Sequence, residues 1–231
     1  MKHIAVILAR GGSRRLPRKN ILEINGKPML AWSIEAAVQS GQYDRIVVST
    51  DDQQIAEIGR SFGAEVPFLR EEAADDLTPS SEATLAALRQ SEEYWGEQYD
   101  VVSQLMANCP LRDAEDITGA VQNFINKGAE SQICCFRFGW MNPWWAARLD
   151  ERGRPDYLFP EARVARSQDL PHLYCPSGAI WIANSSVLKS AKTFYIPGHI
   201  FHLLSWISAM DIDDAADLEM AQACFLIKRK I

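Results

Sequence analysis

Five cationic side chains crowd into one short stretch near the start of the chain. The stretch is residues 9–20, Ala-Arg-Gly-Gly-Ser-Arg-Arg-Leu-Pro-Arg-Lys-Asn, and it directly follows an apolar run over 3–8 that is typical of a buried strand. Gly11 and Gly12 let backbone N–H groups approach phosphate oxygens without a Cβ atom in the way. Arginine and lysine add charge-assisted hydrogen bonds to such oxygens. The stretch predicts a polyanion site, against the alternative of a glycine-rich turn that binds nothing.

This loop differs from two familiar phosphate-binding patterns. A P-loop needs Gly-Lys followed by Ser or Thr, whereas Gly26-Lys27 is followed by Pro28. A dinucleotide fingerprint needs a third glycine at the helix start, where this chain has Arg14.

A group of carboxylates near the other end of the chain is the second candidate. In an extended backbone Asp211 and Asp213 point to the same side, and a cation between them would relieve their repulsion. Mg²⁺ suits such a pair because it takes one or two carboxylates and fills its other positions with water and substrate phosphates. The alternative is that Asp213 or Asp214 caps the final helix, with Asp217 in its first turn.

The elements that must position these residues alternate between strand and helix. The pattern predicts strands at 3–8, 45–49, 99–105, 131–136 and 178–183, a brief extended piece at 65–68, and helices at 29–40, 53–62, 114–127, 185–190 and 215–227. Another helix is expected to begin at a cap formed by Ser80 or Ser81 and to run to residue 94. This order indicates an α/β fold, a mostly parallel sheet flanked by helices on both faces. Ligands of such sheets bind beyond the carboxyl ends of the strands, where the first loop emerges.

The alternation stops between residues 139 and 173, where prolines, arginines and three tryptophans replace it. We expect one domain over 1–231 with an inserted extended arm at about 139–173. For Trp140, Trp144 and Trp145 we favour packing in the core or in a dimer.

Composition limits the remaining possibilities. The net charge of −6 and the lack of a long basic run beyond the first loop argue against a nucleic-acid surface. An odd count of five cysteines without a Cys-x-x-Cys pair fits a reducing compartment. No apolar run approaches the length of a membrane span, and no leader segment is visible. We expect a cytoplasmic protein with no membrane partner.

The first loop resembles the start of the acylneuraminate cytidylyltransferases, the CMP-sialic acid synthetase group. Their pattern Ala-Arg-x-x-Ser-x-x-x-Pro-x-Lys-Asn is matched by Ala9, Arg10, Ser13, Pro17, Lys19 and Asn20. The resemblance extends over roughly residues 3–225 and implies a Rossmann-like nucleotidyltransferase fold, Mg²⁺ as cofactor, and a homodimer whose arm reaches the neighbouring site.

The resemblance also implies roles for particular residues. Catalysis would fall to Arg10, Lys19 and Asp211, and the metal to Asp211 and Asp213. The nucleotide would be held by Ala9, Arg10, Gly11, Gly12, Ser13, Arg15, Lys19, Asn20, Arg70, Thr78 and Ser80.

The match is weaker where the sugar would bind. The family usually has Leu-Gln-Pro-Thr-Ser-Pro-Leu-Arg, but here Met106 replaces the glutamine and Gln104 lies two residues before it. The lysine expected after Pro143 is Trp145. Gln104, Met106, Arg166 and Tyr174 are therefore the sugar-binding candidates, and the stretch Arg-Ser-Gln-Asp-Leu is similar to relatives that act on pseudaminic acid.

These features together predict a cytidylyltransferase that joins CTP to a nine-carbon 2-keto sugar acid, sialic acid or a relative, and releases pyrophosphate. Three alternatives stay open: another sugar nucleotidyltransferase, a metal-dependent glycosyltransferase that uses Asp-x-Asp, or a nucleotide-sugar binding module without catalysis.

Overall fold

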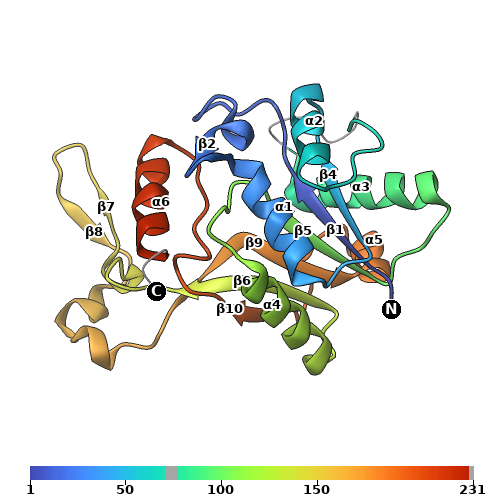
Figure 1. The fold of residues 1–231 in the computed structure, drawn as a ribbon. Coiled ribbons are helices and arrows are strands. Elements are labelled where there is room, and N and C mark those ends of the chain that lie inside the picture. Colours follow the sequence, from blue (N-terminus) through green and yellow to red (C-terminus); the bar gives the residue numbers. More distant parts are fainter. Residues whose placement is uncertain (71–77, 229–231) are drawn as a thin grey trace.

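The computed structural model describes residues 1–70 and 78–228 of the 231-residue chain. Its centre is a six-stranded sheet in the order β10-β6-β9-β5-β1-β4 (Figure 1). The strands are β1 (His3–Leu8), β4 (Arg45–Ser49), β5 (Val101–Met106), β6 (Ser131–Arg137), β9 (Tyr174–Asn184) and β10 (Ile200–Leu203). β9 runs antiparallel to both of its neighbours, and the other pairings are parallel.

Helices cover both faces of this sheet because its strands are apolar on both sides. Ala5 and Ile7 of β1 pack in one hydrophobic cluster with residues of α1 (Met29–Ser40), α2 (Gln53–Ser61) and α4 (Ala114–Lys127). Ile4 and Val6 face the other way, into a cluster with α3 (Ser80–Trp95) and α5 (Ser185–Ala191). The predicted α/β fold with a mostly parallel sheet is confirmed.

A third cluster joins the beginning and the end of the chain. It packs α6 (Ala215–Lys228) against the short hairpin β2 (Glu23–Ile24) and β3 (Lys27–Pro28), with Ile24, Phe225 and Ile212 buried. Trp32 and Phe225 meet there with their ring centroids 4.8 Å apart. This cluster holds the residues before α6 against the rest of the domain.

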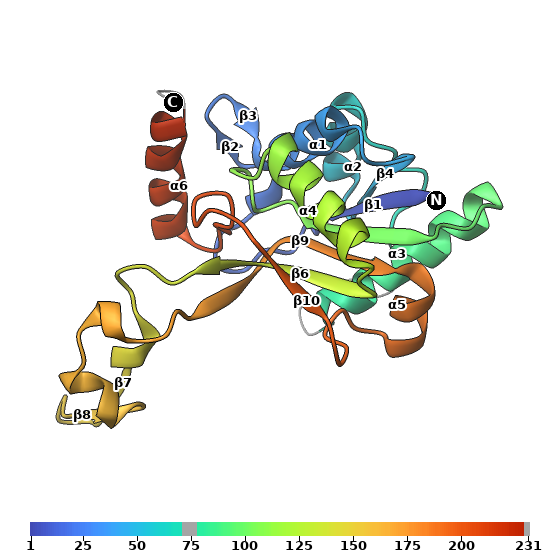
Figure 2. The ribbon, with the colours of Figure 1, turned by 90° about the horizontal axis from the view of Figure 1, so that it is seen from below.

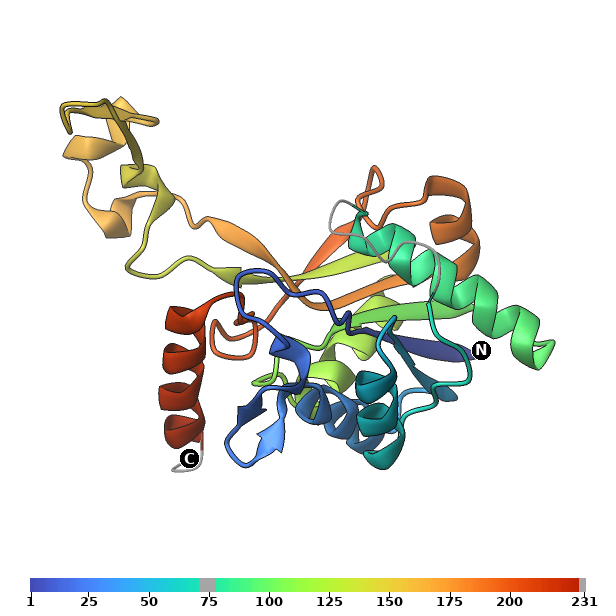
Figure 3. The same cartoon turned by 90° about the horizontal axis from the view of Figure 1, so that it is seen from above.

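The segment between β6 and β9 leaves the sheet. It contains the hairpin β7 (Ala147–Leu149) and β8 (Pro155–Tyr157) and the short 3-10 helices η2 (Pro143–Trp145), η3 (Pro160–Val164) and η4 (Ser167–Asp169). Figures 2 and 3 show it extending away from the body of the molecule. Trp144 packs on Phe159 and Trp145 donates to the Ala162 carbonyl, so these two rings pack within the arm, whereas Trp140 is 84% exposed.

Some predicted elements differ from the structure. β9 begins four residues before the predicted start at residue 178, because the part nearest the arm pairs with β6 across a register shift. The edge strand β10, the hairpins β2–β3 and β7–β8 and the 3-10 helices, among them η1 (Lys19–Ile21), were not predicted. Residues 71–77 and 229–231, which belong to the predicted single domain, lie outside the described residues. None of the described helices has both the length and the apolarity to cross a bilayer.

Candidate active site

The cationic loop after β1 is fixed by contacts from two neighbouring elements. The Asn20 side chain donates to the Arg10 carbonyl at 2.9 Å, which closes the loop on itself. Arg18, which has a positive φ of 55°, donates to Gln54 of α2 at 2.6 Å. A Cβ atom on Gly11 would lie 2.8 Å from the Asp52 carboxylate, so only glycine lets the loop pass this close to the start of α2.

One predicted phosphate donor is already engaged. The Gly11 N–H donates to the Asp51 carboxylate at 2.9 Å, since the loop lies directly against the acidic pair that follows β4. Ala9 is fully buried, and neither it nor Gly11 or Gly12 is among the described residues that line the two cavities here. The loop therefore presents its side chains, and in this conformation not its Gly11 amide, to a ligand.

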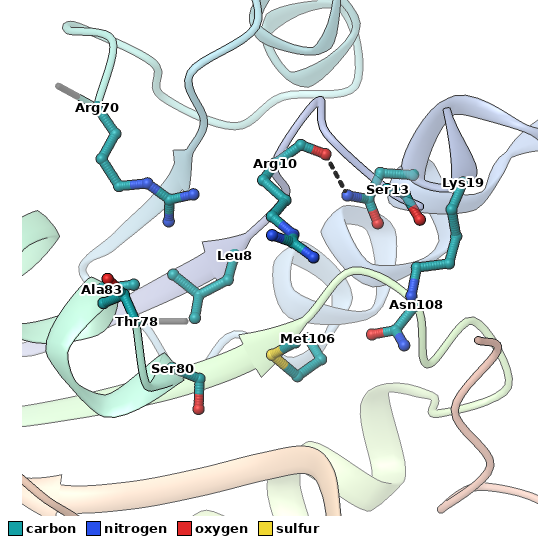
Figure 4. Close-up of a pocket in the computed structure, with 11 residues that line it drawn as sticks. Leu8, Arg10, Ser13, Lys19, Arg70, Thr78, Ser80, Ala83, Met106 and Asn108 are labelled. Atoms are coloured by element: carbon teal, nitrogen blue, oxygen red, sulfur yellow. Dashed lines mark hydrogen bonds between the residues drawn. The ribbon is translucent and has the colours of Figure 1, made fainter. Parts of the chain in front are cut away.

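A small cavity of about 230 Å³ lies beside the loop, at the carboxyl ends of β1 and β5 (Figure 4). Arg10, Ser13 and Lys19 reach it from the loop, and Arg70 and Ser80 from the opposite side. Thr78, Asn20 and Asn108 are also in its lining. Burial lowers the pKa of Arg70, Asp51 opposes the shift, and the nearby Arg10 adds to it. Two guanidinium groups directed to one space supply hydrogen-bond donors to a polar ligand.

A larger cavity of about 590 Å³ adjoins the first and shares Arg10, Ser13, Lys19, Ser80, Met106 and Asn108 with it. Its remaining wall brings in Arg15, Asp211 and Asp213, together with Gln104, Gly178 and Trp181 from the sheet. The structure thus brings together the two predicted clusters, from opposite ends of the chain.

The four aspartates around the start of α6 form two pairs with different roles, Asp214 with Asp217 and Asp211 with Asp213. The Asp214 carboxylate accepts from the N–H groups of Ala216 and Asp217, and the Asp217 carboxylate accepts from the N–H groups of Asp213 and Asp214. This pair caps α6. The capping alternative is therefore correct for Asp214 and wrong for Asp213, whose side chain points to the cationic loop.

Asp213 forms ion pairs with the loop across 194 residues of sequence. Its carboxylate accepts from Lys19 at 2.7 Å and also from Arg15. Partial burial acts to raise the pKa of Asp213, but Lys19 and Arg15 outweigh it and hold that pKa below its ordinary value. Burial and the charge of Asp213 act in the opposite direction on Asp211 and raise its pKa. The two carboxylates are thus close enough to repel one another.

The donor set fits Mg²⁺. No group of three metal-ligating side chains occurs among the described residues. Two carboxylates in an open cavity suffice for this ion, because it binds proteins through one or two carboxylates and keeps water or phosphate oxygens in its other positions. Asp211 and Asp213 would hold it beside the loop.

Two predicted sugar-binding residues, Gln104 and Met106, line the larger cavity. Gln104 is fully buried on β5, where its carbonyl oxygen accepts from Thr84 at 2.8 Å and its Nε2 has no partner among the described residues. Met106 covers the next position on the same strand face and lies so close to Gly178 that a Cβ atom there would be 3.0 Å from Met106 Cγ. A small residue at position 178 therefore leaves room for Met106.

Arg166 and Tyr174, the other sugar-binding candidates, do not line either cavity in their own chain. Arg166 lies in the arm and pairs with Asp169 at 2.7 Å, and Tyr174 is exposed where the arm rejoins the sheet. The sugar-binding prediction for these two residues is therefore not tested by the two cavities.

Other residues of the site were missed or assigned another local role. The predicted cap at Ser80 or Ser81 is wrong: α3 starts after Pro79 without a side-chain cap, because Ser80 is already the first helical residue, and it faces the cavities. Asn108 and Trp181 line the site without having been predicted. The only available signal was their proximity in sequence to Met106 and Gly178.

Comparison with known proteins identifies the family. A cytidylyltransferase family model matches residues 4–149. The chain belongs to the cytidylyltransferase family. The loop, the small cavity and Arg70 all fall within the matched residues, whereas Asp211 and Asp213 lie beyond them. Cytidylyltransferases are enzymes that transfer a nucleotidyl group from CTP.

Relatives of this cytidylyltransferase extend the match to its full length. The chain is 32% identical over 231 residues to a pseudaminic acid cytidylyltransferase of Campylobacter jejuni, which covers 100% of this chain and 99% of the relative. It is 33% identical over 226 residues to a CMP-N,N'-diacetyllegionaminic acid synthase of Legionella pneumophila, covering 96% and 95%. The solved structure of a CMP:2-keto-3-deoxy-manno-octonic acid synthetase complexed with CTP has the same fold, with a TM-score of 0.73, 18% identity and complete coverage of both chains.

Proposed function

We propose that this cytidylyltransferase transfers CMP from CTP to the anomeric hydroxyl of a nine-carbon 2-keto sugar acid. The anomeric oxygen would attack the α-phosphorus, the bond from that phosphorus to the β-phosphate would break, and pyrophosphate would leave with its electrons. The hydroxyl proton would pass to water or to one of the two aspartates. The observation that carries the proposal is a cationic loop that faces an Asp-x-Asp pair across one cavity.

The triphosphate would lie along the loop and the base in the small cavity. Arg10, Ser13 and Lys19 supply cations and a hydroxyl on the side shared by both cavities, and Arg15 adds a cation in the larger one. Arg70, Thr78 and Ser80 line the small cavity from the opposite side. Catalysis would consist mainly of positioning and of neutralising charge around the α-phosphate, with Arg10 and Lys19 as the principal cations.

Asp211 and Asp213 would hold Mg²⁺, which when bound supplies positive charge at the α-phosphate and helps to orient the attacking hydroxyl. Asp213 would leave its ion pairs as Arg15 and Lys19 turn to the triphosphate. These two cations therefore have a carboxylate partner before substrate binds and a phosphate partner afterwards.

The acceptor would occupy the larger cavity, above Gln104 and Met106. Met106 at the position of the usual glutamine favours pseudaminic or legionaminic acid ahead of ordinary N-acetylneuraminate, and relatives named for the first two acids match nearly the full length of this chain. Arg166 in the arm, and Tyr174 where the arm rejoins the sheet, would serve a neighbouring copy, which makes a homodimer part of the proposal. A cytoplasmic location, where CTP is made and used, belongs to it as well.

Two assays test the function. CTP with Mg²⁺ should raise the melting temperature clearly more than UTP, ATP or GTP, because a ligand that binds only the native state stabilises it. Pyrophosphate release should then require one member of a panel of 2-keto sugar acids. Equal stabilisation by the four nucleotides would contradict the cytidine assignment. Release of nucleoside diphosphate from an added nucleotide-sugar donor, with no pyrophosphate released from CTP, would indicate a glycosyltransferase. Binding without turnover on the whole panel would indicate a module without catalysis.

A further inference from the structure

The buried side chain of Asn108 contacts the segment that carries Asp211 and Asp213. Asn108 belongs to the loop that follows β5, is 5% exposed and is in the lining of both cavities. Its Nδ2 donates to the Ile212 carbonyl at 3.1 Å and approaches the Asp213 carboxylate at 3.4 Å. Its own backbone carbonyl accepts from the Ile212 N–H at 2.9 Å.

These bonds hold Ile212, the residue between Asp211 and Asp213. Asn108 binds both backbone polar groups of Ile212, and the Ile212 side chain is fully buried in the cluster that contains Ile24 and Phe225. Successive side chains of an extended backbone point to opposite sides. With Ile212 fixed inward, Asp211 and Asp213 are both directed to the cavity.

We propose that Asn108 is a positioning residue for the metal-binding pair, an inference that rests on the proposed function. Arg15 and Lys19 also hold Asp213, but both are expected to turn to the triphosphate when CTP binds. The amide of Asn108 is neutral and gains less from a phosphate than these cations do. It would therefore keep its bonds to the acidic segment throughout the reaction and preserve the geometry of both carboxylates.

The test measures metal binding separately from turnover. Mn²⁺ is titrated into the protein saturated with CTP and without sugar acid, the state in which Arg15 and Lys19 are expected to face the triphosphate. The free ion is followed by its electron paramagnetic resonance signal, and the same titration of CTP without protein is the blank. Asn108→Ala should weaken Mn²⁺ binding about 10- to 100-fold, the usual effect of losing a partner that orients a metal ligand. CTP affinity in the presence of EDTA should change less than about twofold, because the triphosphate is held by the cationic loop.

Three further variants complete the design. Asn108→Leu keeps the branched shape without the donor and should behave like Asn108→Ala, so it replaces that variant if the alanine protein does not fold. Asn123→Ala removes an amide that donates to Gln132 at 2.7 Å, remote from the cavities, and should bind Mn²⁺ like the parent. Asp213→Asn should bind Mn²⁺ more weakly than any of these.

The outcomes separate the two proposals. If Asp213→Asn loses Mn²⁺ affinity while both Asn108 variants bind like the parent, the positioning role is wrong and the metal site stands. If Asp213→Asn also binds like the parent, the metal assignment fails, and the inference about Asn108 fails with it. An equal loss of Mn²⁺ and CTP affinity in the Asn108 variants would show a general structural role and overturn the inference.

Discussion

Asp213 is the residue at which the two halves of the site meet. In the absence of substrate it accepts from Lys19 at 2.7 Å and pairs with Arg15, so part of the charge of the loop is already compensated. A triphosphate must compete with this carboxylate for both cations. Such an exchange of partners keeps the largely buried Lys19 ammonium paired both before and after substrate binds.

Removing single cations from the loop tests its role at this scale. Lys19→Ala and Arg10→Ala should each weaken CTP binding by about 1.5–3 kcal/mol, on the order of 10- to 100-fold in Kd, because each removes a charge-assisted hydrogen bond. Calorimetric titration with CTP measures the change. The matched control is Lys189→Ala, which breaks a comparable ion pair with Glu92, outside both cavities, and should leave Kd unchanged. Parent-like affinity in both loop variants would show that the loop is a solvated turn.

Replacing either aspartate should reduce turnover, but the two replacements should have different effects on stability. Asp211→Asn and Asp213→Asn should each lower kcat by about 100-fold or more, because several kcal/mol of charge stabilisation at the α-phosphate are lost. Asp211→Asn should keep or raise the melting temperature, since burial and Asp213 raise the pKa of Asp211 and so disfavour its charged form in the folded protein. Asp213→Asn should cost about 1 kcal/mol or less by releasing its ion pairs.

The control for this pair is Asp214→Asn, which should cost about 0.5–1 kcal/mol as a weaker helix cap and leave kcat near the parent value. Full turnover by the Asp211 and Asp213 variants would show that these aspartates have only a structural role. Steady-state kinetics and thermal denaturation together distinguish these results.

His3 should make the protein sensitive to acid. Burial lowers the pKa of His3 from 6.5 to about 4, although Asp44 opposes the shift. The unfolded chain therefore binds a proton at a higher pH than the native protein. The stability that His3 contributes is complete above pH 6.5 and is lost as the pH falls toward 4, by about 2–3 kcal/mol across that window. Urea denaturation at several pH values should show a flatter dependence in His3→Gln, and identical profiles would contradict the prediction.

At the scale of elements, the loop after β1 depends on its contact with the start of α2. Gly11→Ala would place a Cβ atom 2.8 Å from the Asp52 carboxylate, which caps α2 by accepting from Gln54 and Ile55. Overpacking of this kind costs about 1–3 kcal/mol, and we expect lower stability together with weaker CTP binding. Gly12→Ala is the matched control, since its added Cβ would meet nothing within 4 Å. A melting temperature equal to that of the parent in Gly11→Ala would show that the loop can move aside.

The longer elements were predictable because their own residues specify them. Helices such as α1 and α4 have apolar spacing and end at Gly41 and Gly128, and β1 is a continuous apolar run. β10 was not predictable, because none of its four side chains is fully buried. The strand is held by backbone pairing with β6, which its own residues do not indicate. The direction of β9 depends on the arm before it, which no local pattern reports.

The site was predictable to the extent that its chemistry depends on charge. Arg10, Lys19, Asp211 and Asp213 stood out by residue type, and the structure brings them to adjoining cavities. Asn108 and Trp181 did not stand out, because an asparagine in a loop and a tryptophan in a strand are common in any fold. Their position follows from the pairing of β5 with β9 and from the bonds between Asn108 and Ile212.

At the scale of the whole molecule, the arm predicts a dimer. It extends from the body of the molecule (Figures 2 and 3). It also exposes large apolar side chains, with Val164 93% and Leu149 70% exposed. Sedimentation should find a dimer in the parent protein and a folded monomer in the Val164→Asp, Leu149→Asp double variant, because a buried unpaired charge is costly. Val38→Asp, at an exposed position of α1, should remain dimeric. If the parent protein sediments as a monomer, the proposal that the arm contributes to the site of a neighbouring copy is wrong.

The separation of the two halves of the site along the chain has a consequence for its biosynthesis. Lys19 and Asp213 are 194 residues apart, so at the usual rate of translation roughly 10–40 s pass between the emergence of one and the other. During that interval Lys19 and Arg15 have emerged before Asp213, the carboxylate with which they pair in the folded protein. A chain released by a premature stop codon after β10 would keep the sheet and the cationic loop but lack both aspartates, so it could not complete the site.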